Sequence, residues 1–336
     1  MRSVTALDVV PSALQQPAAA TVARRPGSIR RTSHVDMRPQ ADGGLVLEGM
    51  ARDLVTTAGG AAVVPAEATA HATLAPDKRL LSLDVSPRRE LGQLLGVPVA
   101  TGFRALVAQT VPEEVTAASP LHLLLDDLPV AALISGYLEL YQPDRPERSP
   151  AERIVKSDIC SGWRSDGTMM VAIGRLGRIP IPVGPAAPRL ESPDDDLGWH
   201  AIGPLPAGAM RRRRRVDVRP APDAPGGSLV VDAMFRDTYT DAAGHETVLH
   251  EYRLDLSADP TGLVVHSVAE PRVLPWTECP AAAASAGALV GHRLDEVRDV
   301  VRVAYRGTST CTHLNDLLRS LGDVPALWGE LTQVLG

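Results

Sequence analysis

The chain has 336 residues, of which 44% are apolar and 22% charged, the balance of a soluble globular protein. Its length is about twice that of an ordinary domain. The net charge of −6 argues against a general nucleic-acid binder, whose phosphate contacts need a basic surface. No apolar run approaches the ~18 residues of a membrane span, and no secretory signal is evident. Three cysteines suit a reducing compartment better than a disulfide framework, so we expect a cytoplasmic protein without membrane or nucleic-acid partners.

Two stretches of the chain repeat each other. Residues 29–39 (IRRTSHVDMRP) and 210–220 (MRRRRRVDVRP) are identical at six of eleven positions. Residues 45–56 (LVLEGMARDLVT) and 229–240 (LVVDAMFRDTYT) are identical at six of twelve. Weaker matches follow in the same order, namely Leu95-Gly96 with Val290-Gly291 and His122-Leu123 with His313-Leu314. We infer two tandem homologous modules, 28–141 and 209–330, related by a pseudo-two-fold axis.

Each module is expected to be α+β, with an antiparallel sheet followed by helices. Alternating runs rich in Val and Leu predict strands. Besides the repeated segments, they cover 68–74, 80–86, 247–256 and 262–269. Near the end of the second module, Leu314, Leu317, Leu318 and Leu321 are spaced as one helix face. Thr310 or Thr312 is the expected N-cap of that helix.

The remaining segments are expected to be connections. Residues 1–27 are rich in Ala and Pro and predict a disordered tail, and 142–208 predict a linker. Within that linker, the prolines of 180–208 favour extended coil over packed structure. Residues 158–174 predict a short hairpin with its turn at Asp166-Gly167.

Charged residues occupy matching places in the repeated strands. They are Asp36 and Arg38, Asp217 and Arg219, Arg52-Asp53, and Arg236-Asp237. We interpret them as cross-strand ion pairs. The run Arg211–Arg215 is interpreted as a solvated face or as ion-pair partners, and an anionic ligand such as a phosphate is the alternative.

The two modules differ in their cysteines, which places the candidate site in the second module. Cys311 and His313 flank the start of the predicted helix, where the helix dipole favours a thiolate. The first module has Pro120 and His122 there. Proline suits the first turn of a helix but can neither ligate nor attack, so we expect the first module to support the site without taking part in its chemistry.

Two hypotheses for this site remain open, a metal site and a thiol site. Under both, we expect Cys279 and Cys311 to lie close to His313. A metal site would use Cys279, Cys311, His313 and His250 as ligands, with zinc or iron as the ion. A thiol site would use Cys311 as the nucleophile, with His313 or His250 as the base and Glu251 orienting His250. Ordinary buried cysteines are the third alternative, and the preferred one for Cys160. No nucleotide-cofactor motif is seen.

The run HEYRLDLSAD…LPWTECP…LVGHRLDEVRDVV…STCTHLNDLLRSL (250–321) resembles the bacterial family called domain of unknown function 2889. The matching places are His250-Glu251, Cys279, Leu289–Gly291 and Cys311–Leu314. The doubled chain, with its RRTSHVDMRP opening and DICSGW middle, resembles an actinobacterial long form of that family. A weaker resemblance of 250–321 is to NifU-type iron–sulfur scaffold proteins. It departs from them because the first strand ligand is not Cys and the final pair is Cys-x-His.

The preferred function is a cytoplasmic metal- or thiol-dependent enzyme acting on a small organic acid or acyl derivative. Hydrolase or lyase chemistry is favoured over redox chemistry. The alternative is a non-catalytic metal or iron–sulfur carrier, and the third is an interaction module whose cysteines are core residues. We expect a monomer with pseudo-dimeric halves or a homodimer.

Overall fold

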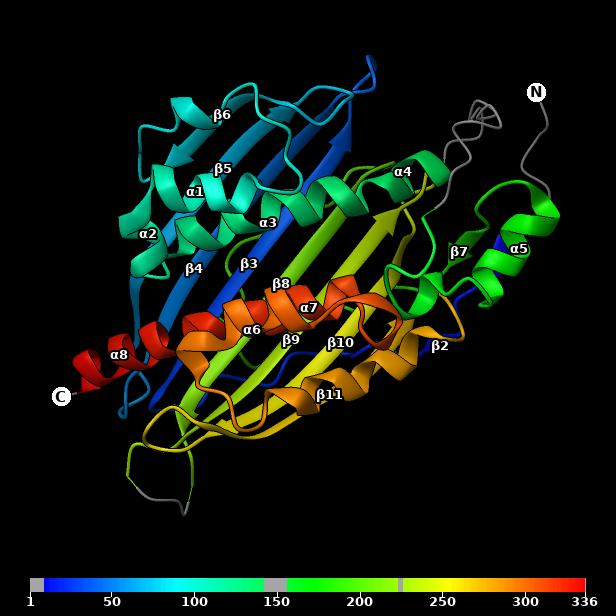
Figure 1. Ribbon diagram of the computed structural model, residues 1–336. Coiled ribbons are helices and arrows are strands. Elements are labelled where there is room, and N and C mark those ends of the chain that lie inside the picture. Colours follow the sequence, from blue (N-terminus) through cyan, green and yellow to red (C-terminus); the bar gives the residue numbers. More distant parts are fainter. Residues whose placement is uncertain (1–8, 142–155, 223–225, 336) are drawn as a thin grey trace.

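A nine-stranded antiparallel sheet runs through the computed structural model, which describes residues 9–141, 156–222 and 226–335 (Figure 1). The strand order is β2-β11-β10-β9-β8-β3-β4-β5-β6. The strands are β2 (Leu14–Gln15), β3 (Ser28–Pro39), β4 (Leu45–Thr56), β5 (Ala62–Leu74), β6 (Leu80–Ser86), β8 (Met210–Pro220), β9 (Leu229–Thr240), β10 (Glu246–Ala258) and β11 (Val264–Leu274). β1 (Val9–Pro11) and β7 (Ile181–Val183) form a separate parallel pair. The strands predicted from alternation are confirmed, and so is the α+β class.

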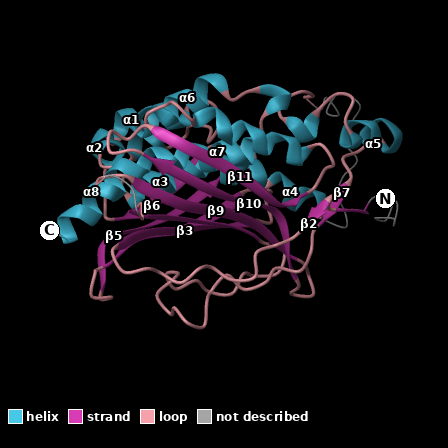
Figure 2. Ribbon diagram, turned by 90° about the horizontal axis from the view of Figure 1, so that it is seen from below, coloured by secondary structure: helices cyan, strands magenta, loops and turns pink. Residues whose placement is uncertain are grey.

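The helices cover one face of this sheet, except α5, which lies to one side of it near β7 (Figure 2). They are α1 (Phe103–Thr110), α2 (Pro112–Thr116), α3 (Pro120–Ile134), α4 (Gly136–Leu140), α5 (Thr168–Leu176), α6 (Val297–Ala304), α7 (Thr312–Ser320) and α8 (Val324–Leu335). Short 3-10 helices span Gly92–Leu94, Ser161–Trp163, Cys279–Leu289, Leu294–Glu296, Gly307–Ser309 and Leu321–Asp323.

The two helices that matter most for the site are α3 and α7. The leucine spacing predicted α7 correctly, because its leucines are fully buried against the sheet. Its N-cap is Cys311 instead of Thr310 or Thr312, and no side chain caps it. In α3, Pro120 occupies the first turn as expected, and the Ser119 hydroxyl accepts a hydrogen bond from the His122 amide at 3.1 Å.

The apolar segment Pro120–Leu140 comprises α3 and α4. Within the described part of the chain, it is the one helical segment long and apolar enough to cross a membrane. However, 83% of its most apolar window is buried inside the structure. Leu121, Leu124, Leu125 and Leu128 belong to the core between the helices and the first half of the sheet, as expected of a core helix.

The predicted tail is wrong for residues 9–27. β2 pairs with β11, and residues 16–27 cross the sheet face opposite the helices together with residues 184–208 (Figure 2). Arg236 donates to the Ala18 carbonyl at 2.6 Å, and Arg30 to the Val22 carbonyl at 2.7 Å. These backbone acceptors balance buried guanidinium groups, which is why the segment is ordered. Residues 1–8 of the predicted tail lie outside the described residues.

The predicted linker is packed for much of its length. Leu190 and Trp199 form a small core with Met234 of β9, so 180–208 is extended but not loosely packed. The predicted hairpin at 158–174 is wrong, because the segment forms the 3-10 turn Ser161–Trp163 and then α5. The Glu278 carboxylate accepts hydrogen bonds from the amide and hydroxyl of Thr168 at the start of α5. Residues 142–155 lie outside the described part of the chain.

Candidate functional site

All five arginines of the run Arg211–Arg215 are buried. The solvated-face interpretation is therefore wrong, and the ion-pair interpretation is confirmed. One face of the sheet is crossed by residues 16–27 and 184–208, here called the crossing segments. On that face, Arg211 pairs with Asp36 of β3, Arg213 with Glu191, and Arg215 with Asp232 of β9. Arg212 and Arg214 face the helices, where both bond Asp316 of α7, at 2.7 and 2.6 Å. The run thus ties the sheet to the structures on both of its faces.

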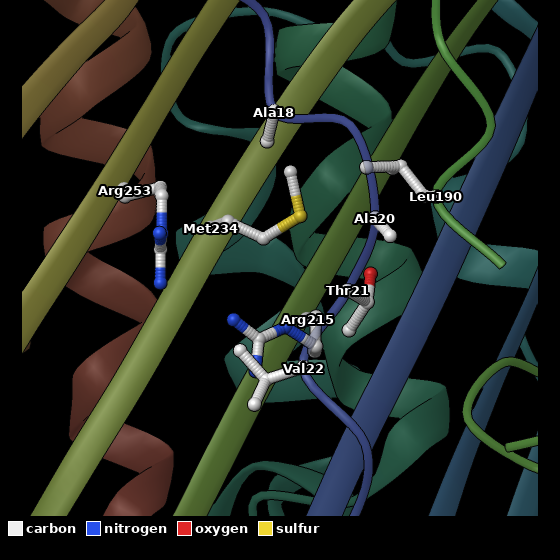
Figure 3. Close-up of a pocket in the computed structure, with 8 residues that line it drawn as sticks. All are labelled: Ala18, Ala20, Thr21, Val22, Leu190, Arg215, Met234 and Arg253. Carbon is white, nitrogen blue, oxygen red and sulfur yellow. The ribbon is translucent and has the colours of Figure 1, made fainter. Parts of the chain in front are cut away.

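A small pocket lies where residues 16–27 pass over the sheet (Figure 3). It is lined by Ala18, Ala20, Thr21, Val22, Leu190, Arg215, Met234 and Arg253. Its two guanidinium groups both pair with Asp232. The pocket therefore has a largely apolar lining with neutralised charges, and its lining residues include no cysteine, histidine or carboxylate.

The helix face of the sheet holds a cluster of Asp237, His250 and His313. Asp237 on β9 and His250 on β10 are directly paired across the strands, next to a register shift in β10. His313 in the first turn of α7 stacks on His250, with ring centroids 3.8 Å apart and 18° between the planes. Among the described residues, this is the one group of three or more His, Cys, Asp or Glu side chains whose ligand atoms all lie within 4.8 Å of one another.

Each residue of this cluster has a fixed partner on its outer side. Arg212 binds both carboxylate oxygens of Asp237, at 2.7 and 2.9 Å. The Tyr137 hydroxyl of α4 lies 3.5 Å from His250 Nε2, and Cys311 Sγ lies 3.8 Å from His313 Nδ1. These contacts restrain the orientation of the carboxylate and of both imidazole rings.

The inner nitrogens of the two imidazoles have no such partner. Among the described residues, His250 Nδ1 and His313 Nε2 are buried without a hydrogen bond, and Asp237 Oδ2 lies 3.6 Å from His250 Nδ1. A buried polar atom without a partner costs about 1–3 kcal/mol, so native proteins rarely leave two together. The two ring nitrogens without hydrogen bonds therefore both lie on the inner side of the cluster.

Burial keeps both imidazoles neutral. Burial, together with His313, holds the pKa of His250 well below its usual value of 6.5. Burial, and secondarily the Arg212 charge, lowers the pKa of His313 to about 3. Neutral imidazole is the form that binds metals.

The cysteines do not behave as predicted from the helix dipole. Burial raises the pKa of Cys311 to about 11, even though the backbone N–H groups at the start of α7 act in the opposite direction. Burial likewise raises the pKa of Cys279 well above 9, and Cys160 is buried as well. The expected thiolate is therefore disfavoured. Cys279 and Cys311 also do not join His250 and His313 in the one candidate ligand group just described.

Glu251 does not orient His250. Neighbouring residues of a strand point to opposite faces, so Glu251 faces the crossing segments while His250 faces the helices. Its carboxylate pairs with Arg236 at 2.5 Å and accepts a hydrogen bond from the Ala18 amide at 2.7 Å. The carboxylate that does lie beside His250 is that of Asp237.

Sequence reasoning thus reached His250 and His313 but missed one member of the cluster, Asp237, and two of its outer partners, Arg212 and Tyr137. Asp237 was interpreted only as an ion-pair partner, because its counterpart Asp53 occurs in the other repeat. Arg212 was one member of a run of five arginines. Tyr137 carried no signal, since it lies 113 positions from His250 in the sequence.

Comparison with known proteins supports the family resemblance for the second half. Residues 210–326 match the family described as "Protein of unknown function (DUF2889)". No curated protein matches the chain. Among solved structures, one described as "Crystal structure of lipopolysaccharide binding protein" is 8% identical, with 97% of this chain and 78% of that chain covered. Its TM-score is 0.16, so this likeness carries no argument.

Proposed function

We propose that the second half of the chain binds one transition-metal ion through Asp237, His250 and His313, and that the protein is a metal-dependent enzyme. The observation that carries this proposal is the pair of buried, unpartnered ring nitrogens beside a buried carboxylate. A bound ion would satisfy both nitrogens at once. It would also add to the positive charge beside Asp237, which pairs with Arg212.

The donor set indicates the kind of ion and its role. Two imidazoles and one carboxylate suit zinc, or iron of the non-haem type. Catalytic zinc sites have three protein ligands and one open position, whereas structural sites have four protein ligands. Cys311 Sγ lies beside His313 Nδ1, where it can accept a hydrogen bond from that nitrogen, so we do not count Cys311 as a ligand. The set then has three ligands. The ion would then supply Lewis-acid chemistry to a bound substrate.

Ligand binding requires a small rearrangement of the two rings. An ion lies in the plane of each imidazole that binds it, at about 2.0–2.1 Å for zinc. The rings of His250 and His313 are stacked, with only 18° between them. They therefore have to tilt apart as the ion enters, which makes the stacked form the metal-free state.

The substrate class remains the one proposed from sequence, a small organic acid or acyl derivative in the cytoplasm. A second candidate function, a non-catalytic metal carrier, is favoured by the depth of the cluster. Asp237 is 0% exposed and His250 is 3% exposed, so a substrate reaches the ion only if the covering elements move.

We also propose that the chain arose by duplication of one module. Two observations support this. Arg30 pairs with Asp217 across the central strands β3 and β8, and the repeat-related Arg211 pairs with Asp36. Such reciprocal contacts are those of a two-fold interface.

The strand register gives the second observation. Asp237 lies opposite His250, and its counterpart Asp53 lies opposite Ala66, with a register shift beside each pair. The first half therefore keeps the aspartate but has alanine in place of the strand histidine. Under this proposal, only the second half binds the ion.

Metal binding is tested with protein purified without a histidine tag and stripped of metal. We expect the wild-type protein to bind one equivalent of Zn²⁺ or Co²⁺, measured by elemental analysis after dialysis. We expect His250→Ala and His313→Ala to lose stoichiometric binding, because each removes one of only three ligands. The matched control is His122→Ala, which removes a buried histidine from the other half. It should keep full binding and cost about 1–2 kcal/mol of stability at most.

The outcomes separate the remaining alternatives. Absence of stoichiometric metal from the wild-type protein, or its retention by His250→Ala, would refute the metal site. Absence of metal together with fast alkylation of Cys311 would favour the thiol nucleophile. If the loaded protein hydrolyses acyl esters and the stripped protein does not, the enzyme is supported. Transfer of the ion to a chelator without turnover supports the carrier.

A further inference from the structure

We propose that Tyr137, from the first half of the chain, is a positioning residue of the metal site, so that neither half forms the complete site alone. This inference rests on the proposed metal site. It departs from the expectation that the first half only supports the fold, because Tyr137 touches a ligand directly.

The Tyr137 side chain meets His250 through both its hydroxyl and its ring. The Tyr137 hydroxyl lies 3.5 Å from His250 Nε2, and the two rings meet edge to face with centroids 5.4 Å apart and 74° between their planes. His250 is therefore held between two rings, with His313 stacked on one face at 3.8 Å. Of these two residues, Tyr137 is the one that lies beside His250 Nε2, the ring nitrogen that points away from Asp237.

The short helix α4 is fixed over the second half by a second tyrosine. Tyr141 stacks on Tyr239 of β9, with centroids 4.1 Å apart and 11° between the planes, and its hydroxyl donates to the Pro182 carbonyl. Tyr137 and Tyr141 are one helical turn apart, so both project from the same side of the helix. The end of the first half is thus docked onto β9 and β10, the two strands that carry Asp237 and His250.

A hydroxyl suits this place because it can both donate and accept. When Nδ1 of His250 carries the proton, the Tyr137 hydroxyl can donate to Nε2. For Nδ1 to bind an ion, the imidazole must carry its proton on Nε2 instead, and Nε2–H then donates to the Tyr137 oxygen. The imidazole stays neutral in both states. In the ion-bound state, Tyr137 thereby holds the imidazole in the tautomer whose Nδ1 lone pair binds the ion, a role that outer partners of metal-ligating histidines commonly have.

The test compares two tyrosine-to-phenylalanine variants. Tyr137→Phe keeps the ring against His250 but removes the hydroxyl. We expect it to raise the Kd for Zn²⁺, measured by competition with a chromogenic chelator, by roughly 10–100-fold. We also expect a shifted visible absorption spectrum of the Co²⁺-loaded protein, since the spectrum reports ligand orientation. Unfolding of the metal-free variant by urea should stay close to wild type.

The matched control is Tyr141→Phe, which removes the hydroxyl of the residue that caps α4 and keeps the ring stack on Tyr239 that docks the helix. It should leave both the Kd and the Co²⁺ spectrum unchanged. Tight binding with an unaltered spectrum in Tyr137→Phe would overturn the inference, and so would equal weakening by both variants. If the wild-type protein binds no ion, the proposed function itself fails. If His250→Ala abolishes binding while Tyr137→Phe has no effect, only this inference fails.

Discussion

Asp316→Ala is expected to destabilise the metal-free protein by about 3–5 kcal/mol, the usual cost of removing one partner of a buried ion pair. Asp316 accepts hydrogen bonds from Arg212 at 2.7 Å and from Arg214 at 2.6 Å, and its side chain is only 4% exposed. Burial disfavours its charge, but Arg214 and Arg212 more than compensate and hold its pKa below the usual value. Without this carboxylate, two buried guanidinium groups lose a shared counter-charge.

The measurement is urea-induced unfolding at neutral pH, followed by circular dichroism. Asp299→Ala is the control, because Asp299 of α6 is likewise ion-paired, with Arg302, but its side chain is 80% exposed. Exposed pairs contribute about 0–1 kcal/mol, so the control should unfold close to the wild-type midpoint. Equal midpoints for Asp316→Ala and wild type would show that the cluster of buried charges does not stabilise the fold.

Asp316 also illustrates what the sequence could not reveal. Asp316 lies 104 positions from Arg212, and the sequence around the arginine run does not indicate that a buried carboxylate pairs with it. Arginines are usually exposed, so the local pattern favoured a solvated face. Burial of Arg212 and Arg214 became evident only when the fold placed α7 over β8.

The positions of the long strands, in contrast, were predictable, although β5 begins at Ala62 and β11 extends to Leu274, beyond the predicted 68–74 and 262–269. β4 spans Leu45–Thr56, the segment inferred from the repeat, because its alternation and its match to β9 are both local properties. The order of residues 9–27 was not predictable, since it depends on distant side chains such as Arg236 and Glu251 that bond the backbone of Ala18.

The candidate site was half predictable. His250 and His313 were singled out because they accompany the cysteines of the second half. Glu251 was chosen as the orienting residue although strand alternation places it on the opposite face from His250, so the correction was available from the sequence. The role of Asp237 could not be predicted from the sequence, because its pairing with His250 depends on the register of β9 against β10, and no single segment determines that register.

The stability of the metal-free protein is expected to fall steeply as the pH drops below about 6.5, the pKa of an unfolded histidine. On the sheet face opposite the helices, His34 Nδ1 and His200 Nε2 lie 2.7 Å apart, and the Thr32 hydroxyl lies 2.8 Å from His200 Nδ1. Burial lowers the pKa of His34 to about 4, with Asp36 acting against it and Arg211 with it. Burial and His34 lower the pKa of His200 to about 3.

These depressed pKa values fix the sign of the effect. Between pH 6.5 and about 4, the unfolded chain binds protons at His34 and His200 that the folded protein does not, so acid favours unfolding. The stability is fully present above pH 6.5. At pH 5 the loss is about 2 kcal/mol for each histidine that stays neutral in the fold. His250 and His313 add to the loss in the same direction, because burial lowers their pKa values too.

Urea unfolding at pH 7.5, 6.0 and 5.0 measures this dependence in the wild-type protein and in the double variant His34→Gln/His200→Gln. Glutamine does not titrate in this range, so the double variant should lose less stability between pH 7.5 and 5.0 than wild type, whatever its stability at pH 7.5. Carboxylates whose pKa is held low act below this window: the pKa of Asp195, for instance, is held below its usual value by Arg24 against the effect of burial. Burial instead raises the pKa of Asp127 to about 6, so that group offsets part of the loss, equally in wild type and in the double variant. A wild-type stability that is flat from pH 7.5 to 5.0, or an unchanged slope in the double variant, would show that these histidines are accessible to protons in the folded state.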